Sequence, residues 1–97
     1  MLSKEEILKI LEQLKEEMVD KYKIERIGLF GSFIKGGQKE NSDIDILVEF
    51  GKEADLFDFL GLSLFLEEAL KQKVDVVSKA SLREELRESV LKEVAYL

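Results

Sequence analysis

Two aspartates, Asp43 and Asp45, stand two residues apart in a run where they alternate with isoleucine. Residues two apart on a strand share a face, so both carboxylates would lie about 7 Å apart on one side of the strand, with Ile44 and Ile46 on the other. Two such carboxylates are poorly suited to unpaired burial and well placed to share divalent cations. Carboxylate oxygens suit hard cations, so the pattern predicts a site for Mg²⁺, with Mn²⁺ as the alternative.

A third carboxylate, Asp75, interrupts the short β-branched run of residues 73–77. If that run forms a strand beside the strand of Asp43 and Asp45, it would bring the third carboxylate to the same face of one sheet. Three carboxylates placed in this way are a plausible arrangement for two metal ions.

The residues that precede the aspartates are suited to bind phosphate. Gly31 allows the backbone to approach a ligand closely, and Ser32 offers a hydroxyl and an amide to a phosphate group. Lys35 could add a positive charge, although a lysine in such a loop is more often simply solvated. Ser42 stands directly before Asp43, where its hydroxyl can bond the local backbone.

The elements that must position these residues follow from the hydrophobic pattern. Apolar residues at helical spacing predict helices over 3–21, over 55–71 and from 81 to 93. Runs rich in β-branched or alternating apolar residues predict strands over 24–30, 43–50 and 73–77. The glycine-rich stretch over 31–42 predicts a loop. Ser3 with Glu6, and Ser81 with Glu84, are capping-box patterns for the first and last helix. The order α-β-β-α-β-α predicts an α/β fold, a mixed sheet of about three strands with helices packed on it.

Composition narrows the chemistry. The chain has 97 residues, so we expect a single domain over 1–97. It contains neither cysteine nor histidine, which excludes disulfides, thiolate or imidazole metal sites and a Ser-His triad. The net charge of −6 argues against a nucleic-acid partner. The sequence holds no apolar run long enough to span a membrane and starts with a polar amphipathic segment, so we expect a cytoplasmic protein without a membrane partner.

The combined motif resembles a known family. Gly31-Ser32, followed after ten residues by Asp43-Ile44-Asp45 and then by Ile-Leu-Val, is similar to the signature of the DNA-polymerase-beta-type nucleotidyltransferases, and the whole run resembles their minimal nucleotidyltransferase (MNT) branch. The run around Asp75 is similar to the third-carboxylate strand of that branch. The likeness covers nearly the whole chain and implies the nucleotidyltransferase fold. The chain departs from the branch at Phe33, where an arginine is common.

The resemblance implies roles for the residues. Gly31 and Ser32 would hold the phosphates of ATP, with Lys35 and Ser42 as further contacts, and the aspartates Asp43, Asp45 and Asp75 would bind two Mg²⁺ ions. The implied reaction is attack of an acceptor hydroxyl on the α-phosphate of ATP, with release of pyrophosphate. Members of the branch commonly pair with a HEPN-domain toxin, and some transfer AMP to a tyrosine of that partner and so act as its antitoxin.

Two functions are compatible with these residues. The first is a Mg²⁺-dependent protein adenylyltransferase that silences a HEPN-type toxin; the alternative is a non-catalytic antitoxin that docks on its partner and keeps a vestigial nucleotide site. The helix over 55–71 is apolar around most of its circumference, which predicts that a partner or a second copy of the chain covers its outer face, unless the C-terminal helix does so. A small-molecule nucleotidyltransferase is disfavoured because no second substrate domain is evident.

Overall fold

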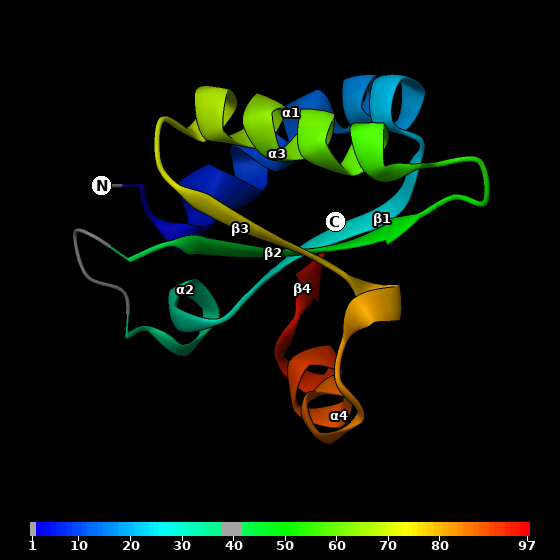
Figure 1. The fold of residues 1–97 in the computed structure, drawn as a ribbon. Coiled ribbons are helices and arrows are strands. Elements are labelled where there is room, and N and C mark those ends of the chain that lie inside the picture. The colour runs from blue at the N-terminus through cyan, green and yellow to red at the C-terminus, as the bar shows by residue number, and fades with distance from the viewer. Residues whose placement is uncertain (1, 38–41) are drawn as a thin grey trace.

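The computed structural model describes residues 2–37 and 42–97. Figure 1 shows the chain order of its elements. They are α1 (Lys4–Tyr22), β1 (Ile24–Phe30), α2 (Ser32–Lys35), β2 (Ile44–Phe50), α3 (Leu56–Leu70), β3 (Val74–Ser78), the 3₁₀ turn η1 (Lys79–Ser81), α4 (Glu84–Glu93) and β4 (Ala95–Tyr96). Residues 38–41 of the predicted loop lie outside the described residues.

The strands form one mixed sheet in the order β3-β2-β1-β4. β1 pairs antiparallel with both β2 and β4, whereas β2 and β3 are parallel and are connected through α3. A parallel pair needs a crossover connection of this kind, and α3 supplies it. The predicted α/β fold is confirmed, and the sheet has one strand more than the three expected, because the last residues of the chain return to the edge of β1.

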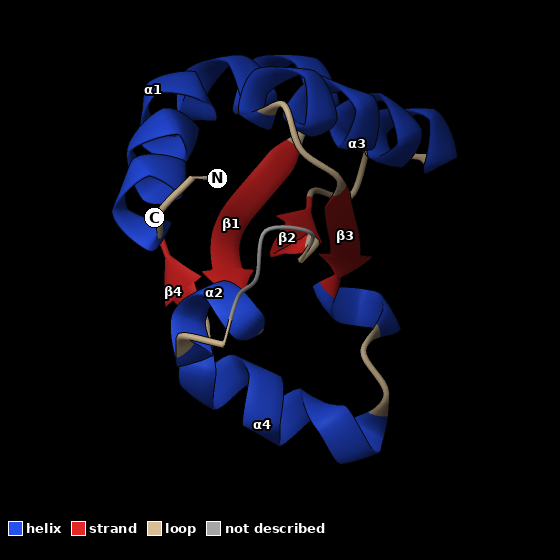
Figure 2. Cartoon of the chain, turned by 90° about the vertical axis from the view of Figure 1, so that its left-hand side faces the viewer, coloured by secondary structure: helices blue, strands red, loops and turns tan. Residues whose placement is uncertain are grey.

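The main core lies on one face of the sheet. α1 and α3 lie side by side over that face, as the two views agree (Figures 1 and 2). The alternation of β2 sends Ile44, Ile46 and Val48 into this core, and the matching residues of β1 are Ile27 and Leu29. Their burial beneath the two helices is the main source of stability.

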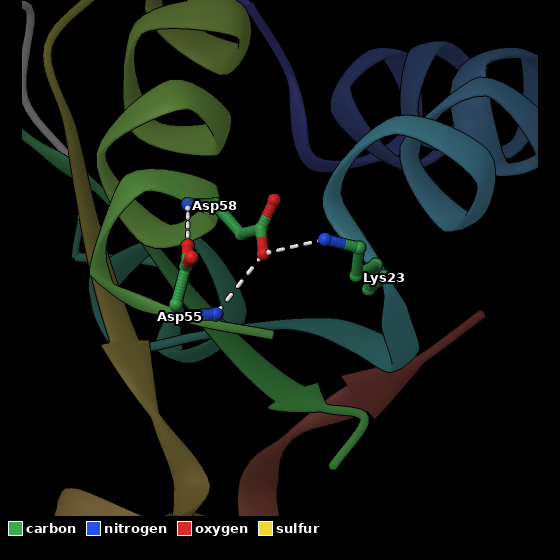
Figure 3. A network of polar contacts seen from close by, with 3 residues as sticks. All are labelled: Lys23, Asp55 and Asp58. Atoms are coloured by element: carbon green, nitrogen blue, oxygen red, sulfur yellow. Dashed lines mark hydrogen bonds and ion pairs between the residues drawn. The ribbon is translucent and has the colours of Figure 1, made fainter. Parts of the chain in front are cut away.

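The helices of this layer have well-formed ends. Ser3 and Glu6 make the predicted capping box of α1. At α3 the Asp55 carboxylate accepts from the Asp58 amide and the Asp58 carboxylate accepts from the Asp55 amide, both at 3.0 Å. The Lys23 ammonium at the end of α1 lies 3.3 Å from the same Asp58 carboxylate, which joins the end of α1 to the start of α3 (Figure 3).

The predicted capping box at Ser81 and Glu84 is wrong. Ser81 ends the turn η1, and Leu82 and Arg83 follow with extended backbone before α4 begins at Glu84. A capping serine must directly precede the helix to reach its first free amides, and two extended residues separate Ser81 from them. Within the described chain, Arg83 stands at the N-cap position and its side chain makes no capping bond.

The outer face of α3 stays open to solvent. Leu56, Phe57, Leu60 and Leu64 are half or more exposed, and Phe57 reaches 81%. α4 does not cover them, because it lies on the opposite side of the sheet (Figure 2). Among the described residues, no helix is both long and apolar enough to cross a bilayer.

Candidate active site

The two central strands bring the predicted aspartates together. β2 and β3 run parallel in a register that pairs Asp45 directly with Asp75. Register partners on neighbouring parallel strands lie about 5 Å apart and share a face, so the two carboxylates stand side by side on the face opposite to α1 and α3. Asp43 lies two residues before Asp45, and the Ile44 amide between them donates to the Lys73 carbonyl at 3.0 Å, which extends the pairing toward Asp43.

The electrostatics of Asp45 show that the acidic groups are gathered. Partial burial is the main cause that raises the pKa of the Asp45 carboxyl from 3.8 to about 6. The neighbouring charges of Asp75, Asp43 and Glu93, in that order, contribute to the rise. The site therefore holds negative charge in excess, which a bound cation would relieve.

The loop after β1 is fitted closely to Asp45. Gly31 has φ +79°, in the left-handed region that favours glycine, and a Cβ built on it would overlap the Asp45 carboxylate. Its carbonyl accepts from the Ile34 and Lys35 amides, so it caps the short helix α2. Glycine at this position therefore allows the loop backbone to lie against the acidic cluster.

The remaining predicted phosphate contacts lie around the same loop. Ser32 is the first residue of α2, half-buried, and its carbonyl accepts from the Gly36 and Gly37 amides. The Lys35 side chain is 65% exposed. The carbonyl of Ser42, just before Asp43, accepts from the Gln72 side-chain amide at 2.9 Å.

Phe33 belongs to the core and not to the cluster. Its ring is 1% exposed and packs with the core residues. The departure from the family pattern at this position therefore adds a hydrophobic anchor under the loop.

Sequence reasoning missed Glu93, the last residue of α4. One of its carboxylate oxygens accepts from the Gly31 amide at 3.2 Å, and the other lies 3.3 Å from the Lys35 ammonium. The residues that follow it form β4, where Tyr96 pairs with Gly28 and the Leu97 amide donates to the Ile27 carbonyl. The apolar ending Val-Ala-Tyr-Leu was the only local signal of such a strand.

A contact at the far end of the same face fastens this last strand. The Arg26 guanidinium lies 3.6 Å above the centre of the Tyr96 ring and 3.6 Å from the Glu49 carboxylate. Stacking of this kind adds to the two-residue pairing of β4 with β1. The C-terminal strand is thereby held on β1, and Glu93 is held next to Gly31.

The acidic side chains of the cluster are the donors available to a metal ion. Within residues 2–37 and 42–97, no three acidic side chains are arranged so that they would hold one ion as they stand. The donor chemistry nevertheless fits a hard cation, since every acidic group of the cluster is a carboxylate. The raised pKa of Asp45 marks the charge that such a cation would neutralise.

Comparison with known proteins defines the class. The model of the nucleotidyltransferase domain family matches residues 11–97, and this chain belongs to that family. The protein adenylyltransferase MntA of Thermococcus cleftensis is 42% identical to it over 97 residues, which are 100% of this chain and 98% of that protein.

Solved structures agree with this assignment. A structure assigned to the minimal nucleotidyltransferases aligns with a TM-score of 0.84 and 34% identity, over 99% of this chain and 97% of the other. A toxin-antitoxin structure with AMP-PNP aligns with a TM-score of 0.70 and 32% identity over 98% and 72% of the two chains. A complex of the tri-AMPylated HEPN toxin of Shewanella oneidensis with its MNT antitoxin gives 0.64 and 26% over 91% and 69%.

Proposed function

We propose that this chain is a protein adenylyltransferase that transfers AMP from ATP to a hydroxyl group, expected to be a tyrosine, of a HEPN-domain toxin and so acts as its antitoxin. The observation that carries the proposal is the register pair Asp45–Asp75 beside the loop of Gly31. The relatives support it, since one is named as a protein adenylyltransferase and another is the antitoxin in complex with an AMPylated HEPN toxin.

Each of the predicted site residues has a proposed role in this reaction. The Gly31 and Ser32 backbone, with Lys35, would bind the phosphates of ATP, and Ser42 would support the strand start through its bond from Gln72. Asp43, Asp45 and Asp75 would hold two Mg²⁺ ions, with Mn²⁺ as the alternative. Such ions, when bound, neutralise the charge that develops on the phosphate and lower the pKa of the attacking hydroxyl.

The reaction is a single in-line displacement. The acceptor oxygen forms a bond to the α-phosphorus, the bond from that phosphorus to the oxygen bridging to the β-phosphate breaks, and pyrophosphate leaves with the bonding pair. The proton of the acceptor hydroxyl passes to the Asp75 carboxylate or to water. Asp75 lies on the edge strand β3 and is exposed, whereas Asp43 and Asp45 are half-buried, so Asp75 is the most accessible carboxylate for an acceptor from outside.

The acceptor is expected to come from another chain. We propose that residues 1–97 act as one domain. The exposed stripe on α3, defined as Leu56, Phe57, Leu60 and Leu64, is our candidate docking surface for the toxin, and self-association through α3 is the alternative use of it.

The test is transfer of label from α-labelled ATP with Mg²⁺ to the HEPN partner. We expect label on the partner with the natural chain, and none with Asp43→Asn combined with Asp45→Asn. The matched control combines Glu16→Gln with Asp20→Asn, which removes two charges from the exposed side of α1 and should leave transfer unchanged. If the site double variant neutralises the toxin fully and the natural chain transfers no label, the protein is a non-catalytic docking antitoxin instead.

A further inference from the structure

Glu93 contacts two of the loop groups that could bind a phosphate. The Gly31 amide donates to its Oε1 at 3.2 Å, and the Lys35 ammonium lies 3.3 Å from its Oε2. The two oxygens of one carboxylate are thus divided between a backbone amide and a lysine. An amide and an ammonium side by side are a common way to bind phosphate oxygens, and a carboxylate is the side-chain anion closest to a phosphate in chemistry.

Glu93 also adds negative charge where the acidic cluster already has an excess. Its side chain is only 19% exposed, so its charge is partly shielded from water. It lies close enough to Asp45 to affect that carboxyl. A triphosphate that entered the loop would meet this carboxylate at the groups it needs, so Glu93 and the triphosphate cannot both use them.

Glu93 lies at a position from which its side chain can be displaced. It is the last residue of α4, and this helix, all of it within the described residues, contains no fully buried residue. α4 also lacks a side-chain cap at Arg83. A rotation of the Glu93 side chain would free the Gly31 amide and the Lys35 ammonium while β4 stays paired with β1 and the core under α1 and α3 is undisturbed.

We propose that Glu93 is an internal competitor of the nucleotide: it holds the Gly31 amide and the Lys35 ammonium in the nucleotide-free chain, and the triphosphate displaces it from both. This inference rests on the proposed nucleotide site. It gives the C-terminal helix a function, because α4 then carries a carboxylate that restrains nucleotide binding and moves when the nucleotide enters.

The test is calorimetric binding of AMP-PNP with Mg²⁺ to the full chain at constant ionic strength. Glu93→Gln keeps a side-chain oxygen for the Gly31 amide and removes the charge, so we expect binding to become about threefold to tenfold tighter. Glu88→Gln is the matched control, since it removes one charge from an exposed position of the same helix, where Glu88 pairs with Lys92, and it should bind as the natural chain does.

A double-mutant cycle with Lys35→Ala separates competition from a general charge effect. With Lys35 absent, Glu93 has only the amide to block, so Glu93→Gln should gain less than it does in the natural background. Equal or weaker binding of the Glu93→Gln variant overturns the competitor role, and weaker binding would place Glu93 among the groups that help to hold the nucleotide and its metal. If neither the natural chain nor the Glu93→Gln variant binds AMP-PNP, both the proposed nucleotide site and the competitor role are contradicted. If binding is unchanged by Glu93→Gln and transfer is intact, only the competitor role is contradicted.

Discussion

The two faces of the sheet are built from the same strands and carry opposite properties. On the face under α1 and α3, Ile44, Ile46 and Val48 of β2 are fully buried in aliphatic surroundings. On the other face, Asp45 of that strand lies half-buried among like charges, beside Asp75 of β3. We name these the core face and the acidic face. The alternation of one strand thus places aliphatic residues in the core and turns Asp45 to the other face, where partial burial and neighbouring carboxylates disfavour its charge.

The strongest test of this comparison is Asp45→Asn. The raised pKa of about 6 means that the folded chain holds the Asp45 proton more tightly than the unfolded chain does. The contribution of Asp45 to stability is therefore present below about pH 4 and is lost as the pH rises through about 6. We expect the variant to lose at least about a hundredfold in transfer rate. It should also unfold at a higher temperature than the natural chain at pH 7.5 without metal.

Transfer assays and thermal unfolding at pH 4 and pH 7.5 check this prediction. The gain in stability should be present at pH 7.5 and small at pH 4, where the natural aspartate is largely protonated. A variant that is less stable than the natural chain at pH 7.5 would show that the acidic face contributes to stability after all.

The inner and outer sides of α3 give a second test, with a matched pair of leucines. Leu66 is fully buried on the core face, and Leu64 on the same helix is 68% exposed. Leu66→Ala should lower the free energy of unfolding by about 2–5 kcal/mol, because it leaves a cavity in the core. Leu64→Ala should change it by less than about 0.5 kcal/mol.

Urea unfolding measures both changes in stability. Binding to the HEPN partner should show the opposite order, with the larger effect at the exposed leucine. Leu64→Ala should weaken the complex if α3 is the docking surface, and sedimentation of the natural chain alone reports whether it self-associates instead. Full-strength partner binding by a Leu64→Ala, Phe57→Ala double variant would place the docking surface elsewhere.

The loop at the acidic face can be tested with two glycines that both have a positive φ. Gly31 and Gly36 have φ of +79° and +83° with ψ of −148° and +11°, so an alanine costs about 1–2 kcal/mol of strain at Gly36 and about 1–3 kcal/mol at Gly31. A Cβ at Gly36 meets open space, whereas a Cβ at Gly31 overlaps the Asp45 carboxylate. Gly31→Ala should therefore also displace Asp45 and reduce transfer at least tenfold, while Gly36→Ala should lower stability alone.

Parallel measurements of urea unfolding and of transfer rate check this pair. Equal losses of transfer in both variants would mean that the loop conformation, and not the space beside Asp45, limits the reaction.

The sequence predicts the core face well because the features that build it are local. Period-two and helical spacing identify the strands and the long helices, and the capping pattern at Ser3 is present as expected. Asp43, Asp45 and Asp75 were also predictable, since two short runs of the same alternating pattern place them on one face once the strands pair. That these residues bind metal and nucleotide stays a prediction.

The C-terminal part of the acidic face was not predictable in the same way. Glu93 reaches Gly31 across 62 positions of sequence, through a two-residue strand too short to show a period. Ser81 matched a local capping pattern, but the backbone after β3 runs on in extended form for two residues before the helix starts. Where a contact depends on how the chain returns to the sheet, local spacing carries no information about it.

The two serines give the smallest and most local test of the comparison. Ser3 caps α1 on the core face: its hydroxyl accepts from the Glu6 amide at 3.1 Å, and its own amide donates to the Glu6 carboxylate at 2.8 Å. Ser3→Ala should lower the free energy of unfolding by about 1 kcal/mol. Ser81→Ala, at an exposed position that matches the same motif, should change it by less than about 0.3 kcal/mol, because the residue stands outside the helix it was predicted to cap. Urea unfolding of both variants side by side checks this prediction, since a loss at Ser81 equal to that at Ser3 would mean that α4 starts two residues earlier in solution.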